Sequence, residues 1–174
     1  MFHHPSLKKW NNLKMFFQDL NLDFIIAPSN HDVFFGDNSL RGVFNQSFNF
    51  TYPLKLDENF SNKFNFHILD STSKYEHSLF FAKDKEEVVI QHHSPGSNLK
   101  DIANSLPHLD VPKIDKLKMN LNTKLTYILG DFGIHYGFFC FQEDNLRIIG
   151  SGLGTQFHEI LIFHNDEFFR FILE

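Results

Sequence analysis

Short apolar runs that end abruptly in polar clusters constrain this chain more than any other feature. Three of these runs end at Ile26, Ile90 and Leu129, and polar or small residues follow each within three positions. Runs of this length are typical of buried strands in an α/β sheet, and ligands usually bind beyond the carboxyl ends of such strands. The clusters are Ser29–Asp32, His92–Pro95 and Gly130–Gly133. We therefore expect the three clusters to converge on one site.

The spacing of apolar residues predicts a helix followed by strands. From Leu7 to Leu20 they recur every three or four positions, which indicates one apolar stripe along a helix, and Ser6 can cap the helix start. Strands are expected at Asp23–Ala27, Asn65–Asp70, Val88–Gln91, Thr126–Leu129, Phe138–Gln142, Leu146–Gly150, His158–Phe163 and Phe168–Leu173, the last four joined as hairpins. Val33–Asn65 is predicted to be a long excursion with at most short strands, and Ser94–Asn122 a lid or insertion. A short helix is expected at Glu76–Ala82.

Composition excludes several classes of function. The 174 residues suit one domain, and 16 Lys and Arg against 21 Asp and Glu give a net charge of -5, which argues against a broad nucleic-acid surface. No apolar run approaches the roughly 18 residues that a membrane-spanning helix needs, and the first residues lack the pattern of a signal peptide. We expect a soluble, cytoplasmic protein. The single cysteine, Cys140, excludes an internal disulfide and a cysteine-rich zinc module.

The polar clusters contain the donor types that hydrolytic metal sites use. An amide oxygen at Asn30, imidazoles at His92 and His93 and a carboxylate at Asp131 form a nitrogen and oxygen set that zinc, manganese or iron accepts. The plainer interpretation is that each cluster is a polar turn, because Asn and Asp are common turn residues. Convergence of the clusters in space would distinguish the two interpretations.

The order of these blocks resembles the calcineurin-like metallophosphoesterase superfamily. The blocks are Phe24–Asp32, Ile68–Thr72 with Glu76, Val88–Pro95, and Tyr127–Gly133 followed by Leu146–Gly154. In that family a Gly-Asn-His-Asp/Glu block, an isolated His block and a Gly-His-x-His block follow one another after strands, and in a bacterial branch the last reads Gly-Asp-x-Gly. The likeness covers residues 7–174. Its most specific piece is Asn30-His31-Asp32 followed by the His-Ser-Pro block that begins at His93.

The resemblance implies metal-dependent hydrolysis of a phosphate ester on an incomplete two-sheet αββα sandwich. The implied metal ligands are Asn30, His93, His92 as its fallback, and Asp131. His31 would lie beside the phosphate, where it stabilises transition-state charge or protonates the leaving oxygen, and Asp32 would orient it. The intact family site holds two divalent ions, Mn, Fe or Zn. The substrate would be a phosphorylated small molecule or polymer.

The sequence also departs from the family pattern. An Asp-x-His block and a Gly-Asp-x-x-Asp block precede the Asn-His block in the family, and the 29 residues before Asn30 contain neither. Ser29 stands where the family has glycine, and Gly133 replaces the last histidine. We therefore expect one metallophosphoesterase-like domain over residues 1–174 with its amino-terminal part missing, and weak metal binding.

The missing blocks carry strands that would neighbour the strand predicted at Asp23–Ala27. Their absence predicts an apolar sheet edge and an apolar helix face that another chain covers. The candidates are an upstream-encoded chain, the rest of a longer protein, or a second copy in a homo-dimer. The rival function is a non-catalytic binding or assembly subunit that retains the scaffold with a degenerate metal site. A β-rich module unrelated to phosphate chemistry would require the three clusters to lie far apart.

Overall fold

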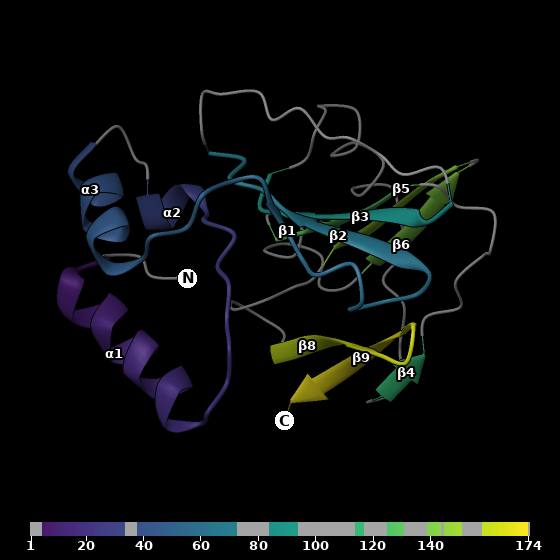
Figure 1. The fold of residues 1–174 in the computed structure, drawn as a ribbon, viewed down its shortest axis with the longest axis horizontal. Helices are drawn as coiled ribbons and strands as arrows, with labels where there is room; N and C mark the ends of the chain where they lie inside the picture. Colours follow the sequence, from purple (N-terminus) through teal and green to yellow (C-terminus); the bar gives the residue numbers. More distant parts are fainter. Residues whose placement is uncertain are drawn as a thin grey trace.

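The chain forms an α/β structure with two sheets and a group of helices to one side (Figure 1). The computed structural model describes residues 5–33, 38–72, 84–93, 114–116, 125–130, 139–143, 145–150 and 158–173. The helices are α1 (Leu7–Asp19), α2 (Asn30–Val33) and α3 (Asn38–Ser47). The strands are β1 (Leu54–Lys55), β2 (Phe64–Ile68), β3 (Glu86–Gln91), β4 (Ile114–Lys116), β5 (Leu125–Leu129), β6 (Phe139–Glu143), β7 (Leu146–Gly150), β8 (His158–His164) and β9 (Glu167–Leu173).

In the described part of the chain, the larger sheet has six strands in the order β1-β2-β3-β5-β7-β6. Strands β2, β3, β5 and β7 are parallel, and β1 and β6 pair antiparallel at the two edges. Their register aligns Ile68 with Ile90 and Ile90 with Ile128, so β2, β3 and β5 end at the same edge of the sheet. We call this edge, from which the segments after these strands leave, the carboxyl edge.

The smaller sheet is antiparallel, in the order β4-β9-β8, and packs against one face of the larger sheet. Phe168 of β9 lies in one buried cluster with Phe66 of β2 and Val88 of β3, and Phe163 of β8 packs against it. The turn between β8 and β9 has positive φ at Asn165 and Asp166, a conformation that Asn and Asp tolerate and that two-residue hairpins require. Strands β2, β3 and β5–β9 match the strands predicted from Asn65 onward to within a few residues.

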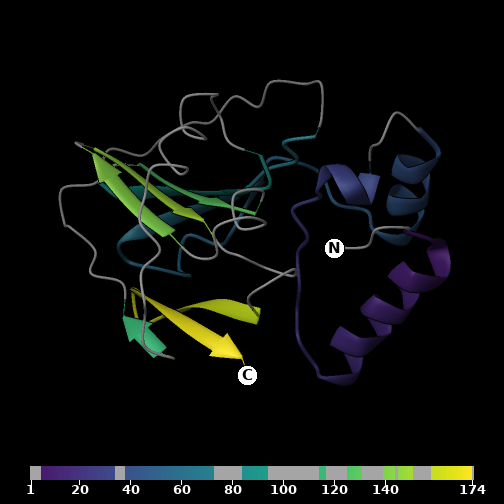
Figure 2. The same ribbon diagram turned by 180° about the vertical axis from the view of Figure 1, so that it is seen from behind.

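The helices have a hydrophobic core of their own. Helix α1 confirms the predicted helix, and the Ser6 hydroxyl caps it by accepting a hydrogen bond from the Lys9 N–H. Trp10 is fully buried and meets Phe44 and Phe48 edge to face, with ring centroids 5.5 and 5.4 Å apart. The helices contact one another and lie beside the two sheets in both views (Figures 1 and 2).

Two predictions about the amino-terminal half are wrong. Asp23–Ala27 is not a strand: the segment is extended but unpaired with any described strand, and Phe24 and Ile26 pack into the helical core instead. The predicted apolar sheet edge at this segment is therefore not formed, because the edges of the larger sheet are β1 and β6. The second wrong prediction is that Val33–Asn65 contains at most short strands, because this stretch contains the ten-residue helix α3 as well as β1.

Other predictions fall outside the described residues. The helix expected at Glu76–Ala82 is one of them, and within Ser94–Asn122 only β4 is described. None of the helices in the described ranges is both long enough and apolar enough to span a membrane.

Candidate functional site

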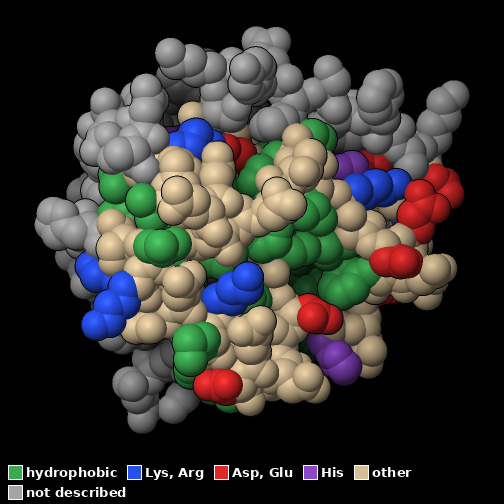
Figure 3. Space-filling model, turned by 60° about the vertical axis from the view of Figure 1, so that its left-hand side comes forward, with side chains coloured by type: hydrophobic (Ala, Val, Ile, Leu, Met, Phe, Trp, Pro, Cys, Tyr) green, Lys and Arg blue, Asp and Glu red, His purple; other side chains and the backbone are tan. Residues whose placement is uncertain are grey.

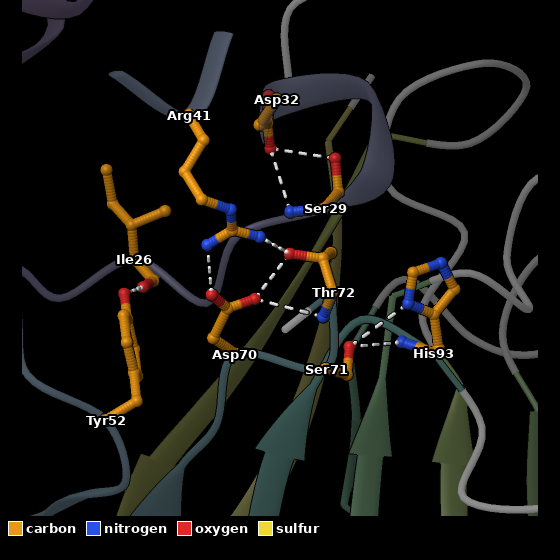
Figure 4. A network of polar contacts seen from close by, with 9 residues as sticks. All are labelled: Ile26, Ser29, Asp32, Arg41, Tyr52, Asp70, Ser71, Thr72 and His93. Atoms are coloured by element: carbon orange, nitrogen blue, oxygen red, sulfur yellow. Dashed lines mark hydrogen bonds and ion pairs between the residues drawn. The ribbon is translucent and has the colours of Figure 1, made fainter. Parts of the chain in front are cut away.

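The carboxyl edge brings together segments that lie far apart in the sequence (Figure 4). Asp70–Thr72 follow β2, His92 and His93 follow β3, and Gly130 follows β5. The turn that begins at Ser29 approaches the same edge from the helical side, above Thr72. The parallel arrangement of β2, β3 and β5 is the cause, because successive parallel strands release their following loops on one side of the sheet.

The turn at Ser29–Asp32 is fixed by hydrogen bonds between its first and last residues. The carboxylate of Asp32 accepts hydrogen bonds from the backbone N–H of Ser29 at 3.2 Å and from its hydroxyl at 2.8 Å. The N–H of Asp32 in turn donates to the Ser29 carbonyl at 3.0 Å. Asp32 is 2 % exposed, and Val33 anchors the turn in the helical core. The backbone that carries Asn30 and His31 is thus held by their neighbours.

Arg41 of α3 ties the helical part to the carboxyl edge. Its guanidinium donates to the Asp70 carboxylate at 2.6 Å and to the Thr72 hydroxyl. The other oxygen of Asp70 accepts from the Thr72 N–H at 3.0 Å and from the Thr72 hydroxyl. Asp70 is buried, so its charge needs these donors, whereas the Arg41 side chain is 32 % exposed. These contacts give Asp70 a structural role at this edge.

Tyr52 makes a second tie on the same side. Its hydroxyl donates to the backbone carbonyl of Ile26, so a side chain satisfies a group that the predicted strand would have paired. Burial raises the pKa of the Tyr52 phenol above its ordinary value, the Asp70 charge adds to the increase, and Arg41 opposes it. The phenol therefore remains a hydrogen-bond donor.

His93 is oriented by Ser71. The Ser71 hydroxyl oxygen accepts from the backbone N–H of His93 at 3.0 Å and lies 3.2 Å from Nδ1 of its ring. The side-chain amide of Gln91 donates to the His93 carbonyl at 2.6 Å and holds the loop after β3. If Nδ1 carries the ring proton and donates a hydrogen bond to the Ser71 hydroxyl, Nε2 is the nitrogen that can bind a metal. Hydrogen bonds of this kind commonly fix the orientation of an imidazole ligand.

His92 lies beside His93 and against the end of β5. The two imidazole rings are 4.7 Å apart between centroids, with an angle of 72° between their planes. A Cβ atom at Gly130 would lie 3.1 Å from Nδ1 of His92, closer than ordinary contacts, so glycine at this position makes room for the ring. Both imidazoles therefore lie at the carboxyl edge.

The predicted site residues are only partly described. Asn30 and His31 lie on α2, but only their backbone is described, and Asp131 lies outside the described residues. Within the described ranges no three His, Cys, Asp or Glu side chains form a group that could hold a metal ion. Of the predicted ligands, only His92 and His93 have described side chains at this edge, and the rest of the predicted set is Asn30 and Asp131.

Two residues of this edge were not singled out from the sequence. Arg41 lies in a stretch without a clean apolar period, so no pattern indicated that it would reach Asp70. Ser71 belongs to the Ile68–Thr72 block that carries the family resemblance, and its position directly after a strand was the available signal.

The chain matches no protein-family model, and the searches of curated proteins and of solved structures gave no match. The family resemblance therefore rests on the residue blocks themselves.

Proposed function

We propose that this chain is a metal-dependent phosphoesterase domain, or the part of a longer or two-chain phosphoesterase that carries the Asn-His, His and Asp blocks. One observation carries the proposal: the turn that bears Asn30 and His31 and the loop that bears His93 lie at the same edge of the sheet. The finer fold, an incomplete αββα sandwich of the metallophosphoesterase type, belongs to the same proposal.

The residues have distinct roles in this proposal. His93, held by Ser71, and Asn30 would bind metal, with Asp131 completing the set beyond β5. Divalent ions, when bound, supply Lewis-acid polarisation of the phosphoryl oxygens. His31 would donate a proton to the leaving oxygen or stabilise transition-state charge from the turn that Asp32 caps. That Asp32 also orients the His31 ring stays a prediction.

Hydrolysis of an aryl phosphate monoester and an aryl phosphate diester in the presence of Mn²⁺ tests the proposal. We expect His31→Ala to lower the rate about 10²-fold or more, as removal of a general acid does, and His93→Ala to abolish the Mn²⁺ dependence. The matched control is His164→Ala, because His164 is an exposed histidine at the end of β8, in the other sheet. Its activity should equal that of the wild type.

Two results would contradict the proposal. One is hydrolysis that His31→Ala and His93→Ala leave unchanged. The other is a folded wild-type chain that neither hydrolyses these esters nor binds Mn²⁺, Fe²⁺ or Zn²⁺, which would favour the non-catalytic binding or assembly subunit.

A further inference from the structure

Exposed hydrophobic side chains gather on and just after helix α1. Six of the nine large hydrophobic side chains that are exposed in the described part of the chain lie between residues 7 and 25. They are Leu7, Met15, Phe16, Leu20, Leu22 and Ile25. Met15 and Phe16, at the middle of the helix, are 58 % and 55 % exposed. Such a concentration exceeds the scattered apolar residues of an ordinary surface and marks a contact face.

The charges of α1 oppose its own dipole. Lys8 and Lys9 lie in the first turn, and Asp19 ends the last turn. The first turn has no acidic residue and the last turn has no basic one. Positive charge at the amino end and negative charge at the carboxyl end are both unfavourable for an isolated helix, since the backbone dipole has the same signs at those ends. Beside an antiparallel helix, the positive end of α1 would lie next to the negative end of its neighbour, so both unfavourable charges would gain an attractive partner.

The charged and apolar residues share one side of the helix. Lys8, Met15 and Asp19 are separated by seven and four positions, which places them in one row, and Phe16 and Leu20 lie next to that row. We call these five residues the α1 stripe. At helical spacing, Lys8, Met15 and Asp19 lie on the side of α1 opposite the buried Trp10. Phe16 and Leu20, both more than half exposed, lie between that row and Leu13, which packs against the helical core.

We propose that the α1 stripe packs antiparallel against the α1 stripe of a second copy of this chain. A two-fold axis near the middle of the helix would place Lys8 of each copy opposite Asp19 of the other. Met15 and Phe16 would then lie close to the axis and bury each other. A helix of 13 residues is about 20 Å long, enough for both charge pairs to form at once.

The self-complementary pattern is what favours a second copy as the occupant. In a two-fold contact each surface meets itself in reverse, so basic residues at one end require acidic residues at the other. An upstream-encoded chain or an unrelated helix would impose no such relation on one stripe. Helix α1 also lies on the outer side of the molecule, away from the strands, in both ribbon views (Figures 1 and 2).

Hydrophobic and charged side chains both lie at the surface on the side of the molecule that carries the helices. Figure 3, which brings the left-hand side of Figure 1 forward, shows hydrophobic side chains at the surface among Lys, Arg, Asp and Glu side chains. The proposal does not depend on the phosphoesterase function, because none of the stripe residues takes part in the contacts described at the carboxyl edge.

Charge-swapped variants of the full chain test the proposal by sedimentation velocity across the micromolar range. We expect the wild type to show a concentration-dependent dimer. Lys8→Glu and Asp19→Lys should each weaken it on the order of tenfold, because two symmetric charge pairs become repulsive. An equimolar mixture of the two variants should restore dimers, since each heterodimer regains both opposite-charge pairs. Both substitutions improve the match to the helix dipole, so folding is preserved.

Phe16→Glu should abolish the dimer, and Gln18→Glu, which adds the same charge at an exposed position off the stripe, should not. A wild type that stays monomeric would overturn the proposal and favour a different partner for this face. A dimer that neither charge variant weakens, or a mixture no more dimeric than its separate components, would also overturn it.

Discussion

The ion pair between Arg41 and Asp70 should couple the stability of the helical part to the carboxyl edge of the sheet. The nitrogen and oxygen lie 2.6 Å apart, with Arg41 32 % and Asp70 6 % exposed. Exposed pairs contribute about 0.2 to 1 kcal/mol, whereas breaking a fully buried pair costs about 3 to 5 kcal/mol. A half-buried pair that also orders Thr72 lies between these limits, and we expect a coupling free energy of about 1 to 2 kcal/mol.

A double-mutant cycle of Arg41→Met and Asp70→Asn measures this coupling. Urea unfolding can be followed by the fluorescence of Trp10, the only tryptophan, which is fully buried in the helical core. The matched control is the exposed pair of Lys55 and Glu58, whose nitrogen and oxygen are 2.9 Å apart. A coupling at Arg41 and Asp70 no larger than that of the control cycle would refute the reasoning.

Two further predictions concern the partly buried carboxyl group of Glu86 and the close contact at Gly130. Burial raises the pKa of Glu86 above the ordinary carboxyl value, although hydrogen bonds from Thr126 and Arg147 oppose the shift. The stability linked to Glu86 is therefore present at low pH and lost as pH rises through its folded pKa, so Glu86→Gln should reduce the fall in unfolding free energy as the pH rises above the ordinary carboxyl pKa. Gly130→Ala should displace the His92 ring, seen as a change in its NMR chemical shifts, because the new Cβ would lie 3.1 Å from Nδ1; unchanged His92 shifts would contradict the contact.

The sequence predicted the elements whose side chains follow a regular period. Helix α1 and its Ser6 cap were found because apolar residues recur at helical spacing after a good capping residue. Strands β8 and β9 were found because the Asn165-Asp166 pair, which tolerates positive φ, separates two apolar runs.

The failures have physical causes in particular residues. Asp23–Ala27 has the composition of a buried strand, but Phe24 stacks on Phe17, with ring centroids 4.7 Å apart, and the segment packs on helices instead of pairing. A short apolar run does not reveal which element will bury it. Helix α3 was missed because Asn, Gly and Ser obscure its period, although Leu40, Val43, Phe44 and Ser47 have helical spacing.

The candidate site shows the same division. The sequence predicted that the clusters after Ile26, Ile90 and Leu129 converge, and the structure places the Ser29–Asp32 turn, His93 and Gly130 at the carboxyl edge. The segment before Ser29 is not the predicted strand, and the loop after β2 was not part of the prediction. The bond from Arg41 to Asp70 joins residues 29 positions apart and depends on how the helical part docks, which no local pattern encodes.

Binding of Mn²⁺ to the intact chain tests the central claim, that the carboxyl edge is a metal-dependent phosphoesterase site, most directly. The signal of free Mn²⁺ in electron paramagnetic resonance, followed during titration with protein, should fall for the wild type and for His164→Ala. His93→Ala removes the imidazole held by Ser71. We expect its affinity for Mn²⁺ to be lower on the order of tenfold, so that more protein is needed for the same fall in signal. Equal binding by His93→Ala and the wild type, or no binding by the folded wild type, would contradict the account.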